Sequence, residues 1–442
     1  MNPRRAAWAV LTRLQETPRR LEALLDEELA RHLASDPRDR AFCANLVYTV
    51  LRQRAYLDHL LAAFVRLPLA RLEPPVLTVL RLGAAELVFL RTPDHAAVHA
   101  AVELSKRQRL YAAVGLVNAC LRALARGWPE APAPAGDAAS RLATQYSHPA
   151  WLVAELLERW GEAQTEAWLG ANQEPSPPAL RANTPRLGRE GLRDLLAPLC
   201  SDLREHPLAP ESLILAGPHP PVAALPGFKE GLWQMQDPAA TALGHLLGVS
   251  PGMRVLDLCA GAGGKTGHLA ALMQNQGELL AVEPSPGRAA ALKENLERLG
   301  VVIARVLEAD GTRLPPGLGR FDRVLVDAPC TGLGVLGRRP DLRWRRSPGD
   351  PARLAGLQLA LASAAADLLA PGGALLYGTC TVTRAENEEV ATALLAARPG
   401  LRLEWGQMPE AMAECLDGQG WWRTMPQGHG CDGFFAARLA RN

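Results

Sequence analysis

The chain has 442 residues, 48% of them apolar, and its net charge is only +2. A chain of this length is expected to fold as two or three domains. No apolar run is long enough to span a membrane, and no signal-type apolar segment follows Arg4 and Arg5, so we expect a soluble, cytoplasmic protein. Eight scattered cysteines without a Cys-x-x-Cys pair argue against a zinc ribbon and against a disulfide framework, and we expect no metal site.

Residues 1–128 have the apolar periodicity of an all-α domain. Helices are predicted over 53–65, 74–90, 95–107 and 112–126, where apolar side chains recur at helical spacing. This part contains 19 Lys and Arg residues against 12 Asp and Glu residues, an excess of positive charge that favours a polyanionic partner. An ordinary solvated helical surface has the same composition, so charge alone does not identify that partner.

A linker rich in proline and alanine follows this domain. Residues 129–137 contain three prolines and are expected to form a stiff spacer. Residues 138–171 have a helical pattern again, and the prolines after them mark a change to short strands around a helix over 189–199. We therefore predict that residues 138–225 form a helical segment and a small α+β module of the ferredoxin type.

From residue 226 to residue 442, strand patterns alternate with helix patterns, which predicts a doubly wound, Rossmann-like parallel sheet. The predicted strands are 254–258, 278–282, 305–308, 323–326 and 374–377. The predicted helices are 238–247, 265–274, 286–299, 353–369 and 384–397. The last two segments, 421–425 and 433–439, are expected to pair as an antiparallel hairpin.

A glycine-rich loop follows the first strand of this sheet. Glycines there allow a ligand to approach the backbone and leave N–H groups free at a helix N-terminus. It is not a Walker loop, because Cys259 stands where that motif has its first glycine, and it lacks the Gly-x-Gly-x-x-Gly spacing of dinucleotide sites. The residues predicted to bind an adenosyl or nucleotide ligand are Cys259, Ala260, Gly261, Ala262, Gly263, Gly264 and Lys265.

Acidic residues follow the next two strands. Glu283 ends the second strand, where a carboxylate can accept hydrogen bonds from two ribose hydroxyls. Asp310 follows the third strand, where its carboxylate can accept a hydrogen bond from an adenine amino group. A glycine-rich loop, followed by one carboxylate for the ribose and another for the adenine, predicts a site for S-adenosylmethionine. The absence of a second dinucleotide-binding half disfavours NAD.

Two cysteines, Cys330 and Cys380, follow the fourth and fifth strands. Parallel strands have their carboxyl ends at one edge of the sheet, so we expect both thiols beside the methyl donor. A free cysteine is usually a small buried apolar residue, but this pair favours methyl transfer to C5 of a pyrimidine. A thiolate that adds to C6 makes C5 nucleophilic, and Asp327, which also borders the donor, is predicted to hold a proton at N3.

A basic segment lies just beyond Cys330. Five arginines and a tryptophan within nine residues can contact phosphates and stack on a base. Enzymes that modify a base act on single strands or flip the base out, so RNA contacts are expected near the site. A solvated charged loop is the alternative interpretation. The predicted RNA contacts are Arg338, Arg339, Arg343, Trp344, Arg345 and Arg346.

The motifs at Asp327–Cys330 and Thr379–Cys380 resemble those of the NOL/NOP/Sun family of RNA cytosine-C5 methyltransferases. DNA cytosine-C5 enzymes are similar only in the first motif. The resemblance implies that Cys380 attacks C6 and that Cys330 helps to release the product. The ligand loop departs from the family's Cys-Ala-Ala-Pro-Gly-Gly-Lys-Thr, because Gly261-Ala262 replaces Ala-Pro.

Residues 3–128 resemble the RNA-binding domain of the antitermination factor NusB, chiefly in the helical pattern and at Asn118–Arg122. A NusB-like domain before such a methyltransferase is similar to the arrangement in bacterial 16S rRNA cytosine-C5 methyltransferases. The resemblance implies a monomeric enzyme whose substrate is 16S rRNA, either naked or in an early assembly intermediate. A tRNA methyltransferase of the same family and a non-catalytic RNA-binding assembly factor are the alternatives.

Overall fold

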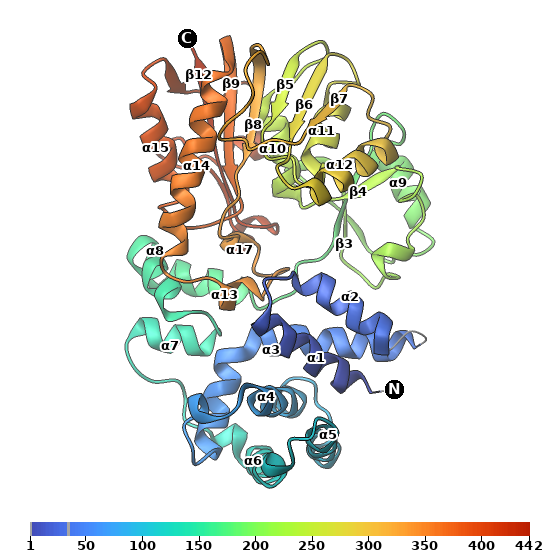
Figure 1. Cartoon of the computed structure of the whole chain (residues 1–442), viewed down its shortest axis with the longest axis vertical. Coiled ribbons are helices and arrows are strands. Elements are labelled where there is room, and N and C mark those ends of the chain that lie inside the picture. Colours follow the sequence, from blue (N-terminus) through green and yellow to red (C-terminus); the bar gives the residue numbers. More distant parts are fainter. Residues whose placement is uncertain (1, 33–35) are drawn as a thin grey trace. The chain divides into compact units, whose positions relative to one another are not determined.

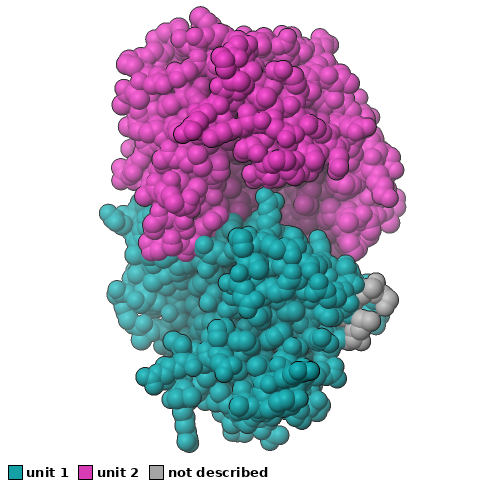
Figure 2. All heavy atoms as spheres, viewed as in Figure 1, with its two compact units in different colours: residues 1–174, 339–345 teal, residues 175–338, 346–442 magenta. Residues whose placement is uncertain are grey.

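The computed structural model describes residues 2–32 and 36–442 (Figure 1). It divides into two compact units, which Figure 2 distinguishes by colour. Unit 1 comprises Met1–Glu174 and Arg339–Arg345, and unit 2 comprises Pro175–Arg338 and Arg346–Asn442. Among the described residues, no helix has both the length and the apolar character that crossing a bilayer requires.

The described residues of unit 1 form helices and loops only, as predicted for its N-terminal part. Its α-helices are α1 (Pro3–Glu16), α2 (Leu21–His32), α3 (Pro37–Phe64), α4 (Pro74–Val88), α5 (Asp94–Arg107), α6 (Val114–Gly127), α7 (Ala138–Gln145), α8 (Ala150–Ala171) and α13 (Leu342–Arg345). Short 3-10 helices span Leu69–Arg71, Tyr111–Ala113 and Trp128–Glu130. The apolar faces of α1–α6 share one core.

Polar caps set the starts of several of these helices. The Asn2 side chain accepts a hydrogen bond from the Arg4 N–H (2.9 Å), and Asp36 accepts one from Arg38 (2.8 Å). In both helices a proline, which lacks an N–H, occupies the first helical position. After the Pro/Ala linker, Asp137 caps α7 by accepting a hydrogen bond from the Ser140 N–H (2.8 Å). The helical segment α7–α8 belongs to unit 1.

Unit 2 begins with the predicted α+β module. Its elements are β1 (Ala179–Ala182), α9 (Arg189–Leu196), β2 (Leu203–His206), β3 (Ala209–Leu215), a 3-10 turn (Val222–Ala224) and β4 (Trp233–Met235). The strands form an antiparallel sheet in the order β2-β3-β1-β4. Leu192 of α9 shares one buried core with Leu180, Leu213 and Trp233, so the helix covers an apolar face of the sheet.

The rest of unit 2 is the predicted doubly wound domain (Figure 1). Its first elements are α10 (Pro238–Leu247), β5 (Arg254–Asp257), α11 (Gly264–Leu272), β6 (Glu278–Val282), α12 (Pro286–Leu299), β7 (Ala304–Leu307), β8 (Phe321–Asp327) and a 3-10 turn (Leu333–Val335). Those that follow are α14 (Asp350–Asp367), β9 (Leu369–Thr379), α15 (Glu388–Ala397), β10 (Leu401–Leu403), α16 (Glu410–Ala413), β11 (Trp422–Thr424), α17 (Pro426–His429) and β12 (Phe434–Arg441).

The sheet of this domain has the order β10-β12-β9-β8-β5-β6-β7. Strands β5 to β9 run parallel, and β12 pairs antiparallel with β9, β10 and β11. The pairing of β11 with β12 is the predicted terminal hairpin, whereas β10 was not predicted. Because β5 and β8 are central neighbours, the loops after them meet at the middle of one sheet edge.

One strand differs from its prediction. β9 begins at Leu369 rather than after the turn Pro371–Gly373, so the proline and glycines lie inside the strand. The register between β8 and β9 shifts between Phe321 and Arg323 to accommodate them. Beyond this irregularity the pairing is regular and places Asp327 beside Gly378, which brings the two cysteine loops together.

Candidate active site

The two predicted thiols lie in contact. Backbone hydrogen bonds join the loops after β8 and β9, from Ala328 N to Gly378 O and from Gly334 N to Cys380 O, each at 2.9 Å. The Sγ atoms of Cys330 and Cys380 are 3.3 Å apart. A side chain at Gly334 would clash with the Gly433 and Cys380 carbonyls, so the close approach of these loops requires glycine there.

The two sulfurs differ in their electrostatic surroundings. A hydrogen bond with Cys330, together with the nearby cations Lys265 and Arg338, lowers the pKa of Cys380 despite its burial. The same hydrogen bond, together with burial, raises the pKa of Cys330 well above the usual value. Cys380 is therefore the sulfur that carries a negative charge more readily, and Cys330 is the sulfur that keeps its proton more readily.

A lysine from the glycine-rich loop reaches the acid at the end of β8. Lys265 Nζ lies 2.6 Å from Asp327 Oδ2 and 5.5 Å from the centre of the Phe434 ring. Burial lowers the pKa of Lys265, but attraction to Asp327 and their hydrogen bond outweigh it, so the pKa is raised. Lys265 thus remains protonated beside Asp327 and the two thiols.

A buried carboxylate, Glu386, organises the loop that carries Cys330. It accepts hydrogen bonds from the Thr331 N–H (2.8 Å), the Thr331 hydroxyl (2.5 Å) and the Thr383 hydroxyl (2.7 Å). Gln358 of α14 donates to Glu386 (3.1 Å) and to the Pro329 carbonyl (2.9 Å). Sequence reasoning did not find Glu386 or Gln358, because neither lies in a motif with recognisable spacing and only the fold brings them to the loop.

The glycine-rich loop has the backbone shape that its glycines predict. Gly261 and Gly263 have φ angles of 57° and 85°, in the left-handed region that favours glycine. A side chain at Gly263 would clash with Leu292 of α12, whereas the space around Gly261 is open. The loop is held by a hydrogen bond from Asn295 Nδ2 to the Ala262 carbonyl (3.0 Å).

The residues that flank this loop are also ordered by hydrogen bonds. Ala260 N donates to the Val282 carbonyl (3.0 Å), and Gly264 and Lys265 start α11. Burial raises the pKa of the Cys259 thiol, which therefore stays protonated. Cys259 lies at the start of this loop, after β5.

Glu283 and Asp310, the two carboxylates predicted to bind the nucleoside part of the donor, differ in burial. Glu283 is buried, and its Oε1 accepts from the Ser285 N–H (2.9 Å) and pairs with Arg288 (3.0 Å). Asp310 is exposed and accepts hydrogen bonds from the Thr312 N–H (2.9 Å) and hydroxyl (2.7 Å), which lower its pKa. Both carboxylates follow adjacent parallel strands, β6 and β7, as predicted.

One of the predicted RNA contacts, Arg343, is not on the surface. Its side chain is fully buried in unit 1. The guanidinium donates to the carbonyls of Arg52 (3.2 Å), Ser147 (3.1 Å) and Asn172 (3.0 Å). Burial lowers the pKa of Arg343 to about 9. The prediction that Arg343 contacts RNA is therefore corrected, because its donors are used to join three backbone segments.

Its neighbours Arg339, Trp344 and Arg345 also contact their own unit. The contacts are Trp344 Nε1 with the Leu51 carbonyl (2.6 Å), Arg345 Nη1 with the Arg19 carbonyl (2.6 Å) and Arg339 Nε with the Glu22 carboxylate (2.9 Å). These side chains are partly exposed. Residues 339–345 of this basic segment are therefore a structural part of unit 1.

The two ends of this basic segment, Arg338 and Arg346, belong to unit 2. Arg338 forms an ion pair with the buried Asp432, and Arg346 Nε donates to the Thr331 carbonyl (2.7 Å). Asp432 N in turn donates to Asp237 (3.3 Å). Arg346 thus contacts the residue next to Cys330, which places its guanidinium at the candidate site.

The sheet order, the glycine-rich loop after β5 and the acids after β6 and β7 define a Rossmann-like methyltransferase domain. Family models agree for each part of the chain. Residues 245–440 match the 16S rRNA methyltransferase RsmB/F model, residues 1–126 match the NusB family, and residues 148–222 match the ferredoxin-like domain of RsmF/B-like methyltransferases.

Whole-chain relatives extend this agreement. The chain is 34% identical over 448 residues to the probable ribosomal RNA small subunit methyltransferase B of Synechocystis sp., with 100% of both chains covered. It is 34% identical to ribosomal RNA small subunit methyltransferase B of Klebsiella pneumoniae over 91% of this chain and 90% of that one. The crystal structure of PH0851 superposes with a TM-score of 0.83 at 26% identity, covering 99% of each chain. The chain belongs to the RsmB/F family of 16S rRNA methyltransferases.

Proposed function

We propose that this enzyme methylates C5 of a cytosine in 16S rRNA, with S-adenosylmethionine as the donor and Cys380 as a covalent nucleophile. The observation that carries the proposal is the 3.3 Å contact between the Cys330 and Cys380 sulfurs. Two thiols that touch each other beside Lys265 and Asp327 are suited to a reaction in which a carbon–sulfur bond must first form and then break.

The first step is assigned to Cys380. C5 of cytosine is a weak nucleophile, and addition of a thiolate to C6 converts the ring into an enamine that reacts at C5. Cys380 is the better attacking sulfur because its pKa is lowered, whereas that of Cys330 is raised. Addition places negative charge on the ring, and a proton that Asp327 relays from water to N3 neutralises it.

Asp327 and Lys265 are the groups assigned to that proton. They form an ion pair of 2.6 Å, at the end of β8 and the start of α11. Asp327 accepts a hydrogen bond from the protonated N3, and Lys265 fixes the orientation of the carboxylate.

The last step is assigned to Cys330. After C5 has gained its methyl group, its remaining proton must leave before the product can become aromatic. Cys330 first loses its own proton to water, and its thiolate then takes the C5 proton. The C5–C6 double bond re-forms, the N3 proton returns to Asp327, and the Cys380–C6 bond breaks with its electron pair to release the Cys380 thiolate. Cys330 is suited to this role because it lies in sulfur contact with Cys380 and holds its proton more firmly.

The donor is placed in the loop between β5 and α11. Bound there, S-adenosylmethionine supplies an electrophilic methyl group. The fit is supported by the left-handed glycines Gly261 and Gly263, which leave the loop backbone accessible, and by the buried carboxylate of Glu283 at the end of the next strand. Asp310 is the proposed partner of the adenine amino group.

The small-subunit rRNA target is inferred from the family and from the named relatives. The excess of basic residues in the first 128 residues supports binding of a polyanion by unit 1. A tRNA cytosine remains the rival target. Bisulfite sequencing of rRNA and tRNA from a strain that lacks the gene separates the two, since only the true substrate loses a protected cytosine.

The mechanism is tested by replacing each thiol with alanine in the full-length enzyme. We expect Cys380→Ala to abolish methyl transfer and to form no covalent RNA complex. We expect Cys330→Ala to accumulate a covalent RNA adduct that survives denaturing electrophoresis, because the adduct forms but is not resolved. Cys415→Ala, which changes a buried thiol outside the site, is the matched control. Full activity of Cys380→Ala overturns the mechanism.

A further inference from the structure

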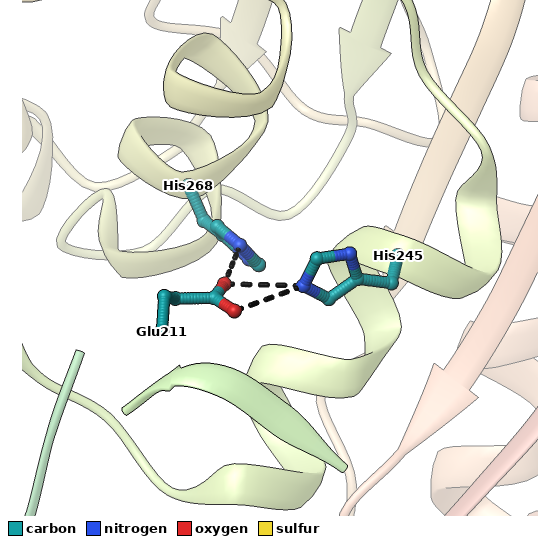
Figure 3. A group of neighbouring side chains, drawn as sticks. All are labelled: Glu211, His245 and His268. Carbon is teal, nitrogen blue, oxygen red and sulfur yellow. Dashed lines mark hydrogen bonds and ion pairs between the residues drawn. The ribbon is translucent and has the colours of Figure 1, made fainter. Parts of the chain in front are cut away.

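A second cluster of reactive side chains lies in unit 2, away from the thiols. Glu211 of β3, His245 of α10 and His268 of α11 point toward one another (Figure 3). One ligand atom from each residue lies within 4.8 Å of the others. His245 Nε2 is 3.1 Å from both carboxylate oxygens of Glu211, and His268 Nε2 forms an ion-pair contact with Oε1.

His268 is unusual among these three. It is only 2% exposed, and among the described residues its Nδ1 has no hydrogen-bond partner, while its Nε2 contacts Glu211. A buried imidazole nitrogen without such a partner is costly, since it loses its water. A side chain at Gly244 would lie 2.4 Å from His268 Nδ1, so α10 has a glycine where the ring packs. The fold thus holds Nε2 toward the carboxylate.

The cluster is also reached from the solvent. A pocket of about 530 Å³ is lined by Glu211 and His245, with Thr184, Arg189, Pro210 and Leu272 around it. His245 is 23% exposed in this pocket, whereas His268 lies behind it. An ion could therefore enter past Glu211 and His245, and a water molecule could complete its coordination from the pocket.

We propose that Glu211, His245 and His268 bind one Zn²⁺ ion. Two imidazole Nε2 atoms and one carboxylate are a ligand set that zinc takes up in tetrahedral sites, with a fourth position for water. Binding requires the carboxylate to turn so that the ion replaces its present contacts with the two rings. The sequence did not predict this site, because its ligands are separated by 34 and 23 residues and no short motif joins them.

The proposed ion would link the two parts of unit 2. Glu211 belongs to the antiparallel module, while His245 and His268 belong to the methyltransferase domain. Helix α11, which carries His268, begins with the donor loop at Gly264. The competing role of the cluster is an ion-pair network in which Glu211 balances the buried guanidinium of Arg181.

The test measures metal content of the full-length protein after removal of any affinity tag. The protein is stripped with a chelator, incubated with zinc chloride and dialysed, and zinc is counted by mass spectrometry. We expect about one zinc ion per chain in the wild type and a higher melting temperature than in the stripped protein. Co²⁺ in place of zinc is expected to give the visible absorption bands of a tetrahedral site.

His245→Ala decides between the two roles, because this partly exposed residue can be removed with little disturbance of the core. We expect it, and Glu211→Gln, to lose the bound zinc, while His219→Ala outside the cluster retains it. Circular dichroism and the melting temperature of the stripped variants report whether they are folded. The proposal is overturned if the wild-type protein holds less than about a tenth of a zinc ion per chain, or if His245→Ala has the same zinc content as wild type.

Discussion

The sulfur of Cys330 lies 3.3 Å from that of Cys380, although the two residues are 50 positions apart in the chain. Parallel pairing of β8 and β9 produces the contact, since it places Asp327 beside Gly378. The two sulfurs are not equivalent, because the pKa of Cys330 is raised and that of Cys380 is lowered. Two cysteines that look equivalent as strand-end thiols are therefore chemically distinct.

The first prediction concerns the pH dependence of Cys380. The thiolate is the reactive form of cysteine, and an unperturbed thiol titrates near a pKa of about 8.5. Because Cys330 lowers the pKa of Cys380, we expect alkylation of Cys380 by iodoacetamide to reach half its maximal rate at a lower pH in wild type than in Cys330→Ala. In Cys330→Ala the donor is absent, so the titration should move to higher pH and the rate at neutral pH should fall.

Peptide mass spectrometry follows the alkylation of Cys380 separately from that of the other thiols. Cys415→Ala serves as the control, because Cys415 is buried elsewhere in the domain. A titration of Cys380 that moves to lower pH in Cys330→Ala would show that the hydrogen bond runs in the opposite direction. Such a result would exchange the roles proposed for the two sulfurs.

The second prediction concerns Lys265. Replacing it with methionine removes the cation 2.6 Å from Asp327 and one of the cations that lower the pKa of Cys380. We expect the rate of methyl transfer to fall by roughly 10²-fold, within the range of acid–base contributions. Lys265→Arg, which keeps the charge, should recover part of the rate. Calorimetry with S-adenosylhomocysteine checks donor binding, and a loss confined to that binding would contradict the role.

The third prediction concerns Glu386, which accepts hydrogen bonds from Thr331, Thr383 and Gln358 in a buried site. Glu386→Gln replaces one acceptor oxygen with an NH2 group, which then faces hydrogen-bond donors instead of accepting from them. We expect a loss of about 2–4 kcal/mol of stability, as for other buried hydrogen-bonded charges, and a lower melting temperature. The exposed Glu389→Gln on the same segment is the control and should stay within about 0.5 kcal/mol of wild type. Equal melting temperatures for the two variants would contradict the network's role.

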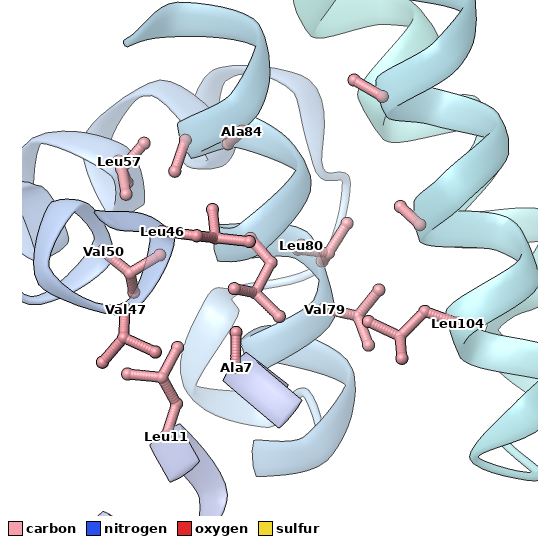
Figure 4. Packing of buried hydrophobic residues seen from close by; sticks show 14 of the residues in the cluster. Ala7, Leu11, Leu46, Val47, Val50, Leu57, Val79, Leu80, Ala84 and Leu104 are labelled. Carbon is pink, nitrogen blue, oxygen red and sulfur yellow. The ribbon is translucent and has the colours of Figure 1, made fainter. Parts of the chain in front are cut away.

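Much of the fold follows from apolar spacing in the sequence. In α3, Leu46, Val47 and Val50 recur on one face, and all are buried in the core that α3 shares with α1, α4 and other helices (Figure 4). The strands of the methyltransferase domain could be predicted because they are short apolar runs followed by glycine or acid. Strand β10 is a short edge strand without such a run, and β9 contains a Pro-Gly-Gly sequence that normally ends a strand.

The candidate site could be predicted only in part. The thiols, the loop and the acids stand at strand ends, a position that the sequence pattern gives directly. Which side chains pair with them depends on tertiary packing. Glu386 and Gln358 lack any local signal, and the buried state of Arg343 contradicts what its charged neighbours indicate. A run of arginines has the same composition whether its guanidinium groups face phosphates or the protein's own carbonyls.

The last prediction separates these two roles for the basic run. Arg343→Ala leaves the carbonyls of Arg52, Ser147 and Asn172 without their donor and opens a cavity in unit 1. We expect a loss of about 3 kcal/mol or more, because several buried acceptors become unsatisfied at once. Arg353→Ala, at a side chain that is 65% exposed, should leave the melting temperature nearly unchanged.

RNA binding gives the independent measurement. A side chain that contacts phosphate contributes to the salt dependence of affinity, so its loss reduces the slope of log K against log salt by about one. We expect no such change for Arg343→Ala at a temperature where the variant is folded, and a reduced slope for Arg346→Ala if its guanidinium meets the RNA beside Cys330. A stable Arg343→Ala protein with a reduced slope would reverse the assignment, because a buried structural arginine cannot release counterions from RNA.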